Sequence, residues 1–292
     1  MRTRLAGWWF VAPALLVLGI FFFVPVLAAF VMSLTDFDLY SLSDIGNLRF
    51  IGFENYARLL HEPLFWKSLG NTFYFVVLGV PLSIAASLGA ALLVNSKVAR
   101  FRHVFRTIYF APVVTTLVAV AVVWRYIFHT RYGFLNYALG FVGIDPVDWM
   151  GDPRWAMPAI VVMAVWKNFG YNMIILLAAL QSIPEDLYEA ARIDGASTWQ
   201  RFRHVTFPSL GPVLLLVSIL TMAGYFQLFA EPYVMTEGGP LESTKSVLYL
   251  RYDEGFKWWS LGRASAVAFM LFVIIFVVTV IQLRIGRREA AT

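Results

Sequence analysis

The sequence predicts an all-α integral membrane protein, and its composition, the length of its apolar runs and its distribution of positive charge support that class. Hydrophobic residues make up 60% of the 292 residues and charged residues only 14%, whereas soluble domains average about 25% charged residues. The apolar residues are gathered in long runs, which is typical of membrane-spanning helices. Cysteine is absent, which excludes disulfides, thiolate metal sites and cysteine nucleophiles.

Six runs of at least 19 residues are predicted to span the membrane, because about 20 residues are needed to cross the hydrocarbon core. They are residues 8–32, 72–94, 107–128, 157–180, 207–229 and 265–283. The first run follows Arg2 and Arg4, as in a signal peptide. It is longer than the roughly 7–15 apolar residues of such a peptide, so we expect a retained helix.

The positive charges predict the orientation. The segments outside the spans fall into two alternating sets. One set carries 12 Lys and Arg against 5 Asp and Glu and consists of residues 1–7, 95–106, 181–206 and 284–292. The other set carries 9 Lys and Arg against 13 Asp and Glu and consists of residues 33–71, 129–156 and 230–264. Basic residues mark the cytoplasmic side, so both termini are predicted to be cytoplasmic. The net charge of +5 is therefore a topology signal and does not indicate a nucleic-acid partner.

The predicted inward segment 181–206, which continues into the next span, is longer and more regular in sequence than a simple turn between two spans requires. Its sequence "PEDLYEAARIDGASTWQRFRHVTFPSL" predicts two short helices, with Ser182 capping the first, Gly195 ending it in a left-handed conformation, and Ser197 or Thr198 capping the second. The apolar stripe of such an element must be covered. Lipid headgroups and a protein partner are equally compatible with it.

The same stretch carries a family resemblance. "EAARIDGA" followed by "FPSL" resembles the EAA signature of permease subunits of binding-protein-dependent ABC importers, and the wider segment is similar to their sugar-transporting branch. "YVMTEGGPLESTKSVLYLRYDEGFKWWSLGRASA" (residues 233–266) and "FENYARLL" (residues 53–60) resemble further stretches of that branch. The chain departs from the pattern at "TFP" (residues 206–208), where Leu-Pro is usual, and lacks the large insertion of the bigger maltose-type subunit.

The resemblance implies a type I ABC importer transmembrane fold in three parts. Residues 1–66 would hold the first spanning helix and an extracytoplasmic loop, residues 67–284 the transmembrane core with its coupling loop at 181–206, and residues 285–292 a cytoplasmic tail. The coupling element that docks on the ATPase would contain Glu189, Ala190, Ala191, Asp194 and Gly195.

The resemblance also implies partners: a second homologous permease, two copies of a cytoplasmic ABC ATPase and an extracytoplasmic solute-binding protein, assembled in the bacterial inner membrane. The chain contains no G-x-x-x-x-G-K-[ST] phosphate loop. ATP and magnesium are therefore expected in the partner ATPase, and no cofactor is expected on this chain. Four scattered histidines give no metal-ligand spacing, and no catalytic constellation is visible.

Polar residues inside two spans predict a translocation path. Lys167 lies near the middle of the fourth span, where a charge costs about 2.5–3.5 kcal/mol unless it faces a bundle interior or an aqueous cavity. At helical spacing it shares a polar sector with Asn168, Tyr171 and Asn172. In the alternative reading, Lys167 is structural and pairs with a partner's carboxylate or with backbone carbonyls.

The fifth span offers a second face, and the resemblance adds specific positions. Hydroxyls, amides and aromatic rings together suit a sugar, which has a polar rim around apolar ring faces. The resemblance implies substrate contacts at Lys167, Phe169, Gly170, Met173, Thr221, Tyr225 and Leu228, to which the polar sector adds Asn168 and Tyr171. It places Gly238, Gly239 and Pro240 on a loop that faces the binding protein, although a plain chain reversal also explains these residues.

Two other classes are less compatible with the sequence. A secondary transporter or channel would call for inverted repeats, broken helices and acidic residues inside the spans, and the sequence shows none of them. A membrane enzyme would need a catalytic group. The predicted function is therefore one half of the pathway for a di- or oligosaccharide or a related polyol, whose identity the sequence does not specify.

Overall fold

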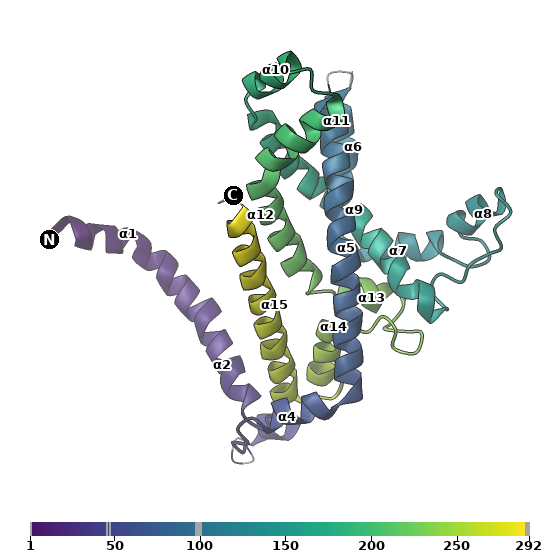
Figure 1. Cartoon of the computed structure of the whole chain (residues 1–292). Coiled ribbons are helices and arrows are strands. Elements are labelled where there is room, and N and C mark those ends of the chain that lie inside the picture. Colours follow the sequence, from purple (N-terminus) through teal and green to yellow (C-terminus); the bar gives the residue numbers. More distant parts are fainter. Residues whose placement is uncertain (1, 45, 47, 97–100, 290–292) are drawn as a thin grey trace. The chain divides into compact units, whose positions relative to one another are not determined.

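The computed structural model describes residues 2–44, 46, 48–96 and 101–289, and helices supply nearly all of the regular structure in these residues (Figure 1). Extended backbone pairs in them only at an isolated bridge between Thr35 and Phe50. The predicted all-α class is confirmed.

The helices follow one another in the order shown in Figure 1. They are α1 Arg2–Leu18, the π-helix η1 Gly19–Phe23, α2 Val24–Ser33, α3 Leu39–Ser43, α4 Glu54–His61, α5 Pro63–Asn95, α6 Arg102–Val114, α7 Leu117–Ile127, α8 Phe134–Gly140, α9 Pro153–Ser182, α10 Glu185–Ile193, α11 Thr198–Arg201, the π-helix η3 Phe202–Thr206, α12 Phe207–Tyr225, α13 Ala230–Met235, α14 Val247–Tyr252, the π-helix η4 Asp253–Lys257 and α15 Leu261–Glu289.

Membrane-spanning helices are present at each predicted position, with one correction. Five stretches of the described chain are long and apolar enough to cross a membrane: Phe10–Ser33, Pro63–Asn95, Pro153–Ser182, Thr198–Tyr225 and Leu261–Gly286. The third predicted span is not one helix. It consists of α6 and α7, which are bent by 100° at the break between them and make the sixth span when counted together.

The break in the third span has a local cause. Thr115 and Thr116 are extended, and the Thr115 hydroxyl donates to the carbonyl of Pro112 at 2.6 Å. A threonine side chain that bonds a nearby carbonyl competes with the helical hydrogen-bond ladder. The fifth span ends at Tyr225, before the predicted Phe229, because the chain then turns toward α13.

By its internal contacts the chain divides into two compact units. The first unit combines Met1–Trp66 with Leu250–Val273, and the second combines Lys67–Tyr249 with Ile274–Thr292.

In the first unit, α4 is tied to the end of α2. The Asn55 amide donates to the carbonyls of Ser33 and Thr35 at 2.9 and 2.8 Å, and the Tyr56 hydroxyl hydrogen-bonds the Ser33 hydroxyl at 2.7 Å. Asn55 is buried. The "FENYARLL" stretch therefore satisfies the backbone groups left open where a spanning helix ends.

The first unit also contains a group of charges around the buried Glu254. Arg263 Nη2 lies 2.5 Å from Glu62 Oε2 and 2.8 Å from Glu254 Oε1, and the Glu254 side chain is 1% exposed. Burial raises the pKa of Glu254 to about 7, with Arg263 opposing the rise and the charges of Glu62 and Asp253 adding to it.

This raised pKa predicts a pH-dependent stability. The folded-state pKa of Glu254 exceeds its ordinary value of 4.5, so its stabilising contribution is complete below about pH 4.5 and is lost as the pH rises through about 7. We expect the melting temperature of the wild type, relative to that of Glu254→Gln, to fall between about pH 5 and about pH 8. The exposed Glu54→Gln is the matched control. A constant difference between wild type and Glu254→Gln would contradict the assignment.

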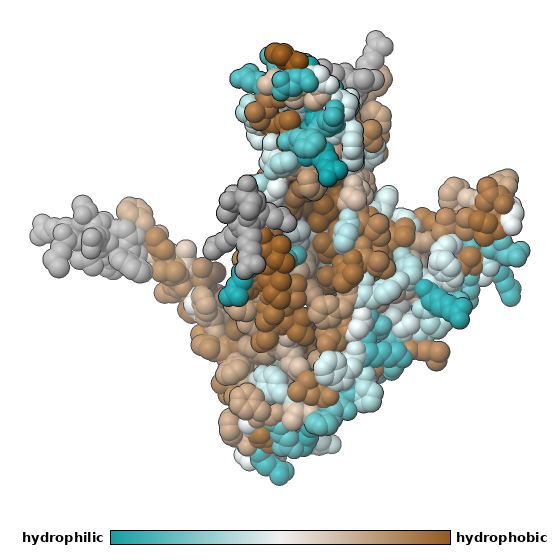
Figure 2. Space-filling model, viewed as in Figure 1, coloured by the Kyte–Doolittle hydropathy of each residue, from teal (hydrophilic) through white to brown (hydrophobic). Residues whose placement is uncertain are grey.

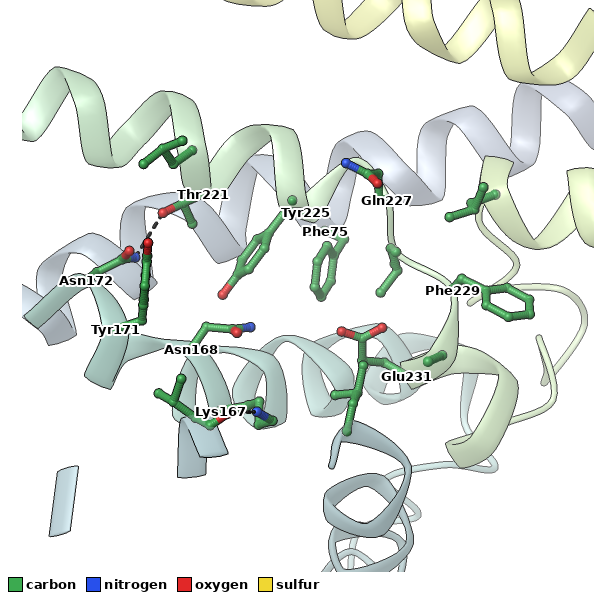
Figure 3. A pocket seen from close by; sticks show the side chains of 17 residues that line it. Phe75, Lys167, Asn168, Tyr171, Asn172, Thr221, Tyr225, Gln227, Phe229 and Glu231 are labelled. Carbon is green, nitrogen blue, oxygen red and sulfur yellow. Dashed lines mark hydrogen bonds between the residues drawn. The ribbon is translucent and has the colours of Figure 1, made fainter. Parts of the chain in front are cut away.

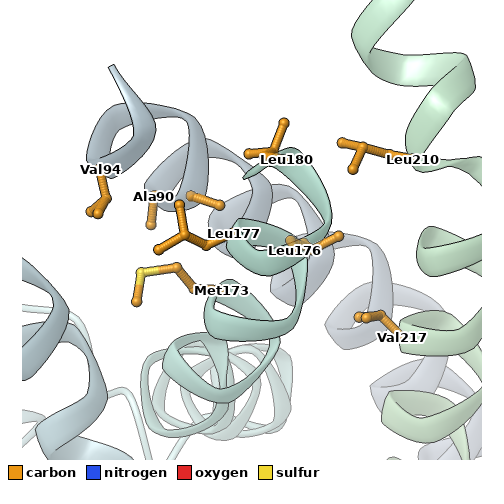
Figure 4. Packing of buried hydrophobic residues seen from close by; sticks show 9 residues of the cluster. Ala90, Val94, Met173, Leu176, Leu177, Leu180, Leu210 and Val217 are labelled. Carbon is orange, nitrogen blue, oxygen red and sulfur yellow. The ribbon is translucent and has the colours of Figure 1, made fainter. Parts of the chain in front are cut away.

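The second unit is built on α5, α9 and α12, which share a hydrophobic core (Figure 4). Small residues on one face of α5 allow close packing: Ser83, Ser87 and Ala90 are buried, and the Ser87 hydroxyl donates to the carbonyl of Phe169 on α9 at 2.9 Å. The core residues shown are Ala90, Ala91, Val94, Met173, Leu176, Leu177, Leu180, Leu210 and Val217.

Candidate functional site

A cavity of about 530 Å³ lies within the second unit (Figure 3). Its wall comes from α5, the α6–α7 break, α9, the end of α12, α13 and α14. The lining residues are Phe75, Val113, Leu117, Lys167, Asn168, Tyr171, Asn172, Leu220, Thr221, Gly224, Tyr225, Gln227, Leu228, Phe229, Ala230, Glu231 and Leu248. The cavity therefore combines amides, hydroxyls, aromatic rings and one charge of each sign.

The α9 side of the cavity carries the predicted polar sector. Lys167 is 8% exposed, and its ammonium donates to the carbonyl of Val113 at 3.0 Å. The Asn172 amide donates to the Thr221 hydroxyl at 2.9 Å, which joins α9 to α12 (Figure 3). The Asn168 amide donates to the Ala164 carbonyl one turn back at 3.0 Å, which leaves its oxygen available.

Tyr225 is held with its hydroxyl directed into the cavity (Figure 3). The centroid of its ring lies 4.9 Å from that of the Phe75 ring. A Cβ on Gly79 would come within 2.7 Å of the Tyr225 ring, so glycine leaves room for this ring. The hydroxyl is buried and makes no well-aligned hydrogen bond with the described residues, although Ser83 and Asn168 lie close by. A buried, unpaired donor is costly, which favours a ligand at this point.

Of the nine residues predicted to face the substrate, six line the cavity: Lys167, Asn168, Tyr171, Thr221, Tyr225 and Leu228. The other three are placed elsewhere. Phe169 packs against Tyr109, with ring centroids 5.7 Å apart, and Met173 is fully buried in the core of Figure 4. A Cβ on Gly170 would lie 2.1 Å from the carbonyl oxygen of Tyr109, so Gly170 allows α9 to approach α6 closely.

Several lining residues were not predicted. Phe75 lies on α5, and Val113 and Leu117 flank the α6–α7 break. Glu231 and Gln227 were visible as polar residues near the outer end of the fifth span. Their position on the wall depends on the turn from α12 into α13, which no pattern in the sequence indicates.

The predicted coupling element has the expected helix–turn–helix form. Gly195 has φ +77°, as a left-handed helix end requires, and Ser197 and Gln200 form a capping box at the start of α11. Ser182 does not cap α10, because its hydroxyl donates instead to the carbonyl of Ala179 at 2.8 Å and Pro184 occupies the cap position.

The outer surface of this element is open. None of the α10 residues is buried, and Ile193 and Trp199 are 87% and 67% exposed. Figure 2 shows hydrophilic and apolar side chains side by side over α10 and α11, whereas apolar side chains dominate the faces of the long helices. The Tyr188 and Thr206 hydroxyls hydrogen-bond at 3.0 Å and fix α10 to the start of α12. All five predicted coupling residues, Glu189, Ala190, Ala191, Asp194 and Gly195, lie in α10 or the turn after it.

The loop with Gly238, Gly239 and Pro240 is fastened to the start of α5. Lys67 Nζ donates to the carbonyl of Leu241 at 2.6 Å, and the Asn71 amide donates to the carbonyls of Glu242 and Lys245 at 2.8 and 2.9 Å. A Cβ on Gly238, whose φ is +82°, would come within 2.7 Å of the Tyr249 ring. Leu241 is 79% exposed at the tip.

No group of three His, Cys, Asp or Glu side chains that could hold a metal occurs in the described part of the chain. Apolar helices long enough to span a membrane, with a polar-lined cavity among them, are features of a membrane transport protein.

Comparison with known proteins specifies that class. The family described as "Binding-protein-dependent transport system inner membrane component" matches residues 79–290. The lactose transport system permease protein LacF of Rhizobium radiobacter is 37% identical over 288 residues, which cover 97% of this chain and 94% of that protein. The trehalose/maltose transport system permease protein MalF of Thermococcus litoralis is 36% identical over 286 residues, covering 98% and 95%.

A solved structure shares the fold. A bacterial ABC transporter involved in the import of the acidic polysaccharide alginate contains a chain that matches with a TM-score of 0.81 at 21% identity, covering 98% of this chain and 96% of that one. The chain therefore belongs to the family of inner-membrane components of binding-protein-dependent transport systems. The predicted class, a multi-pass inner-membrane permease subunit of an ABC importer, is confirmed.

Proposed function

We propose that this chain forms half of the translocation pathway for a saccharide, with the cavity of Figure 3 as the place where the saccharide is held during transport. A second homologous permease would supply the other half. Two copies of a cytoplasmic ABC ATPase would drive transport, and an extracytoplasmic binding protein would deliver the saccharide.

The chemistry of the cavity carries the proposal. A saccharide presents hydroxyls around apolar ring faces, and the wall pairs the rings of Phe75, Tyr171, Tyr225 and Phe229 with amides and hydroxyls. Aromatic rings cover the apolar faces, while amide and hydroxyl groups exchange hydrogen bonds with the rim. The unpaired Tyr225 hydroxyl is the group most in need of such a partner.

The names of the relatives support a saccharide. Two of the relatives are named as transport permeases for lactose and for trehalose and maltose. Another, in Agrobacterium fabrum, is named for sulfoquinovosyl glycerol and is 33% identical over 289 residues, which cover 99% of this chain and 92% of that protein. Each name contains a sugar. A further structure of the alginate transporter was solved with a pentasaccharide-bound periplasmic protein, which supports delivery by a binding protein.

The two ends of the second unit fit contacts with other subunits. The exposed apolar residues of α10 and α11 lie beside charged ones, as expected of a helix pair that docks into a protein cleft. We propose that this element contacts the ATPase. The loop from Gly238 to Leu241 is fastened by Lys67 and Asn71 and is proposed to contact the binding protein.

The test uses the Tyr225 hydroxyl. The importer is reconstituted in vesicles and assayed with radiolabelled lactose, maltose and trehalose. Loss of one hydrogen bond of about 0.5–1.5 kcal/mol should raise the apparent KM of Tyr225→Phe by about two- to thirteenfold with little change in maximal rate. Tyr126→Phe, which removes an exposed hydroxyl outside the cavity, should match the wild type. Unchanged kinetics in Tyr225→Phe would contradict the proposal.

A further inference from the structure

Lys167 meets the end of the interrupted third span. The last carbonyls of a helix have no partner within the helix, and a cation at that end interacts favourably with them. The Lys167 ammonium donates to the carbonyl of Val113, in the last turn of α6, and the Thr115 hydroxyl covers the carbonyl of Pro112. Side chains therefore bond two carbonyls of this last turn, and the Pro112 carbonyl also accepts from the Thr115 backbone N–H at 3.3 Å.

A second contact holds α9 at the same place. Gly170 lies three residues after Lys167, on the same face of α9. A Cβ at Gly170 would lie 2.1 Å from the carbonyl oxygen of Tyr109, so the two helix backbones touch there. Gly170 sets the distance between α9 and α6, and Lys167 closes the end of α6 just beyond it.

The charge of Lys167 has a counterpart on the cavity wall. Glu231 lies in the first turn of α13, and α13 packs against both α7 and α9. Lys167 and Glu231 are the charged residues among those that line the cavity, and Figure 3 shows both side chains on its wall. Their formal charges cancel, which leaves the lining of the cavity without net charge.

We infer that Lys167 is a positioning residue that caps the broken span, with Glu231 as its countercharge, and that the pathway consequently takes an uncharged saccharide. The second part rests on the proposed function. Had Lys167 been a free cation on the wall, it would instead have favoured a carboxylate- or sulfonate-bearing sugar.

The natural absence of cysteine makes the charge of the cavity measurable without a known substrate. Gln227 lines the cavity with an exposed side chain, so Gln227→Cys places a single thiol there. The assembled importer, with thiols of other subunits blocked beforehand, is treated with a cationic and an anionic methanethiosulfonate reagent. Each rate is divided by the rate with 2-mercaptoethanol.

We expect the two normalised rates to agree within about threefold in the parent. A unit charge left unbalanced nearby should shift their ratio about tenfold, toward the anionic reagent in Glu231→Gln and toward the cationic one in Lys167→Met. An anionic preference of about tenfold in the parent that Glu231→Gln leaves unchanged would overturn the inference.

The positioning role of Lys167 is tested by a measurement that does not depend on the charge of the cavity. Amide hydrogen exchange is followed in a peptide covering residues 113–120. Exchange should be about tenfold faster in Lys167→Met and within about threefold of wild type in Lys167→Arg, which keeps both donor and charge. Lys67→Met, at the start of α5, is the matched control. Equal exchange rates in wild type and Lys167→Met would contradict the proposed capping role of Lys167.

A last comparison separates this inference from the proposed function. Lactose and maltose should slow modification of the introduced thiol, whereas lactobionate and maltobionate, their carboxylate counterparts, should not. Protection by the carboxylates alone would overturn the inference. Protection by none of the four would count against the saccharide and hence the proposed function, while the reagent ratio would still report the charge of the cavity.

Discussion

Replacing Glu189 with lysine or Gly195 with valine is expected to reduce ATP-driven uptake to below about a tenth of wild type, which corresponds to losing a coupling free energy of about 1–3 kcal/mol. Both residues belong to the exposed element formed by α10 and α11. Neither residue touches the cavity, so the loss should come from transmission of the ATPase movement rather than from saccharide binding.

The physical reasons differ between the two substitutions. Gly195 has φ +77°, a conformation that a β-branched residue such as valine adopts only at a cost of roughly 1–3 kcal/mol. The turn between α10 and α11 should therefore change shape. Glu189→Lys reverses a charge on the exposed surface of α10, which should repel a partner surface that matches the native charge.

The measurement compares uptake with insertion and ATP hydrolysis in the same vesicles. Both variants should insert at wild-type levels and lose the stimulation of ATP hydrolysis by the loaded binding protein. Gly195→Asn is the matched control because asparagine tolerates positive φ, and it should retain most of the uptake. Gln181→Lys adds a charge just before the element and should also remain active. Wild-type uptake in both Glu189→Lys and Gly195→Val would exclude docking through α10.

Hydropathy predicted the spans because a membrane imposes one requirement on every residue of a run. Hydropathy did not predict the break in the third span. The Thr115 hydroxyl bonds the Pro112 carbonyl locally, but the break is also held by Lys167, which lies 54 positions from Val113 in sequence. A contact of that kind depends on tertiary packing. Broken helices are expected of secondary transporters, and this one occurs in an ABC permease.

Helical periodicity predicted which side chains of α9 share one sector, and substrate contact by these residues stays a prediction. Lys167, Asn168 and Tyr171 fall on one sector of α9 and line the cavity. Phe169, Gly170 and Met173 were assigned through the resemblance, and helical geometry turns them toward α6 and the core instead. Whether any of the three meets the substrate in another conformation stays a prediction.

The sequence left the role of Lys167 open, and that role stays a prediction. A lysine in a span is compatible with an anion site, with a partner's carboxylate or with backbone carbonyls. The bond to the Val113 carbonyl supports the last of these. Glu231, which the linear sequence placed outside the spans, returns to the cavity only because α12 ends at Tyr225 and α13 turns back.

We expect this chain to supply part of the path and a partner to supply the energy for transport. The chain has no phosphate-binding loop of its own. It offers a cavity among its spans and, separately, an exposed helix pair for contact with another protein. Uptake should therefore require every subunit, and this chain alone should show no uptake above background.

The most direct measurement is reconstitution by omission. Vesicles contain either this chain alone or the chain with its partner permease, the ATPase and the binding protein, and uptake of the labelled saccharide is followed with and without ATP inside and with an imposed proton or sodium gradient. We expect ATP-dependent uptake by the complete set, and background uptake when the ATPase or the binding protein is left out. Uptake by this chain alone, driven by either ion gradient, would contradict this expectation.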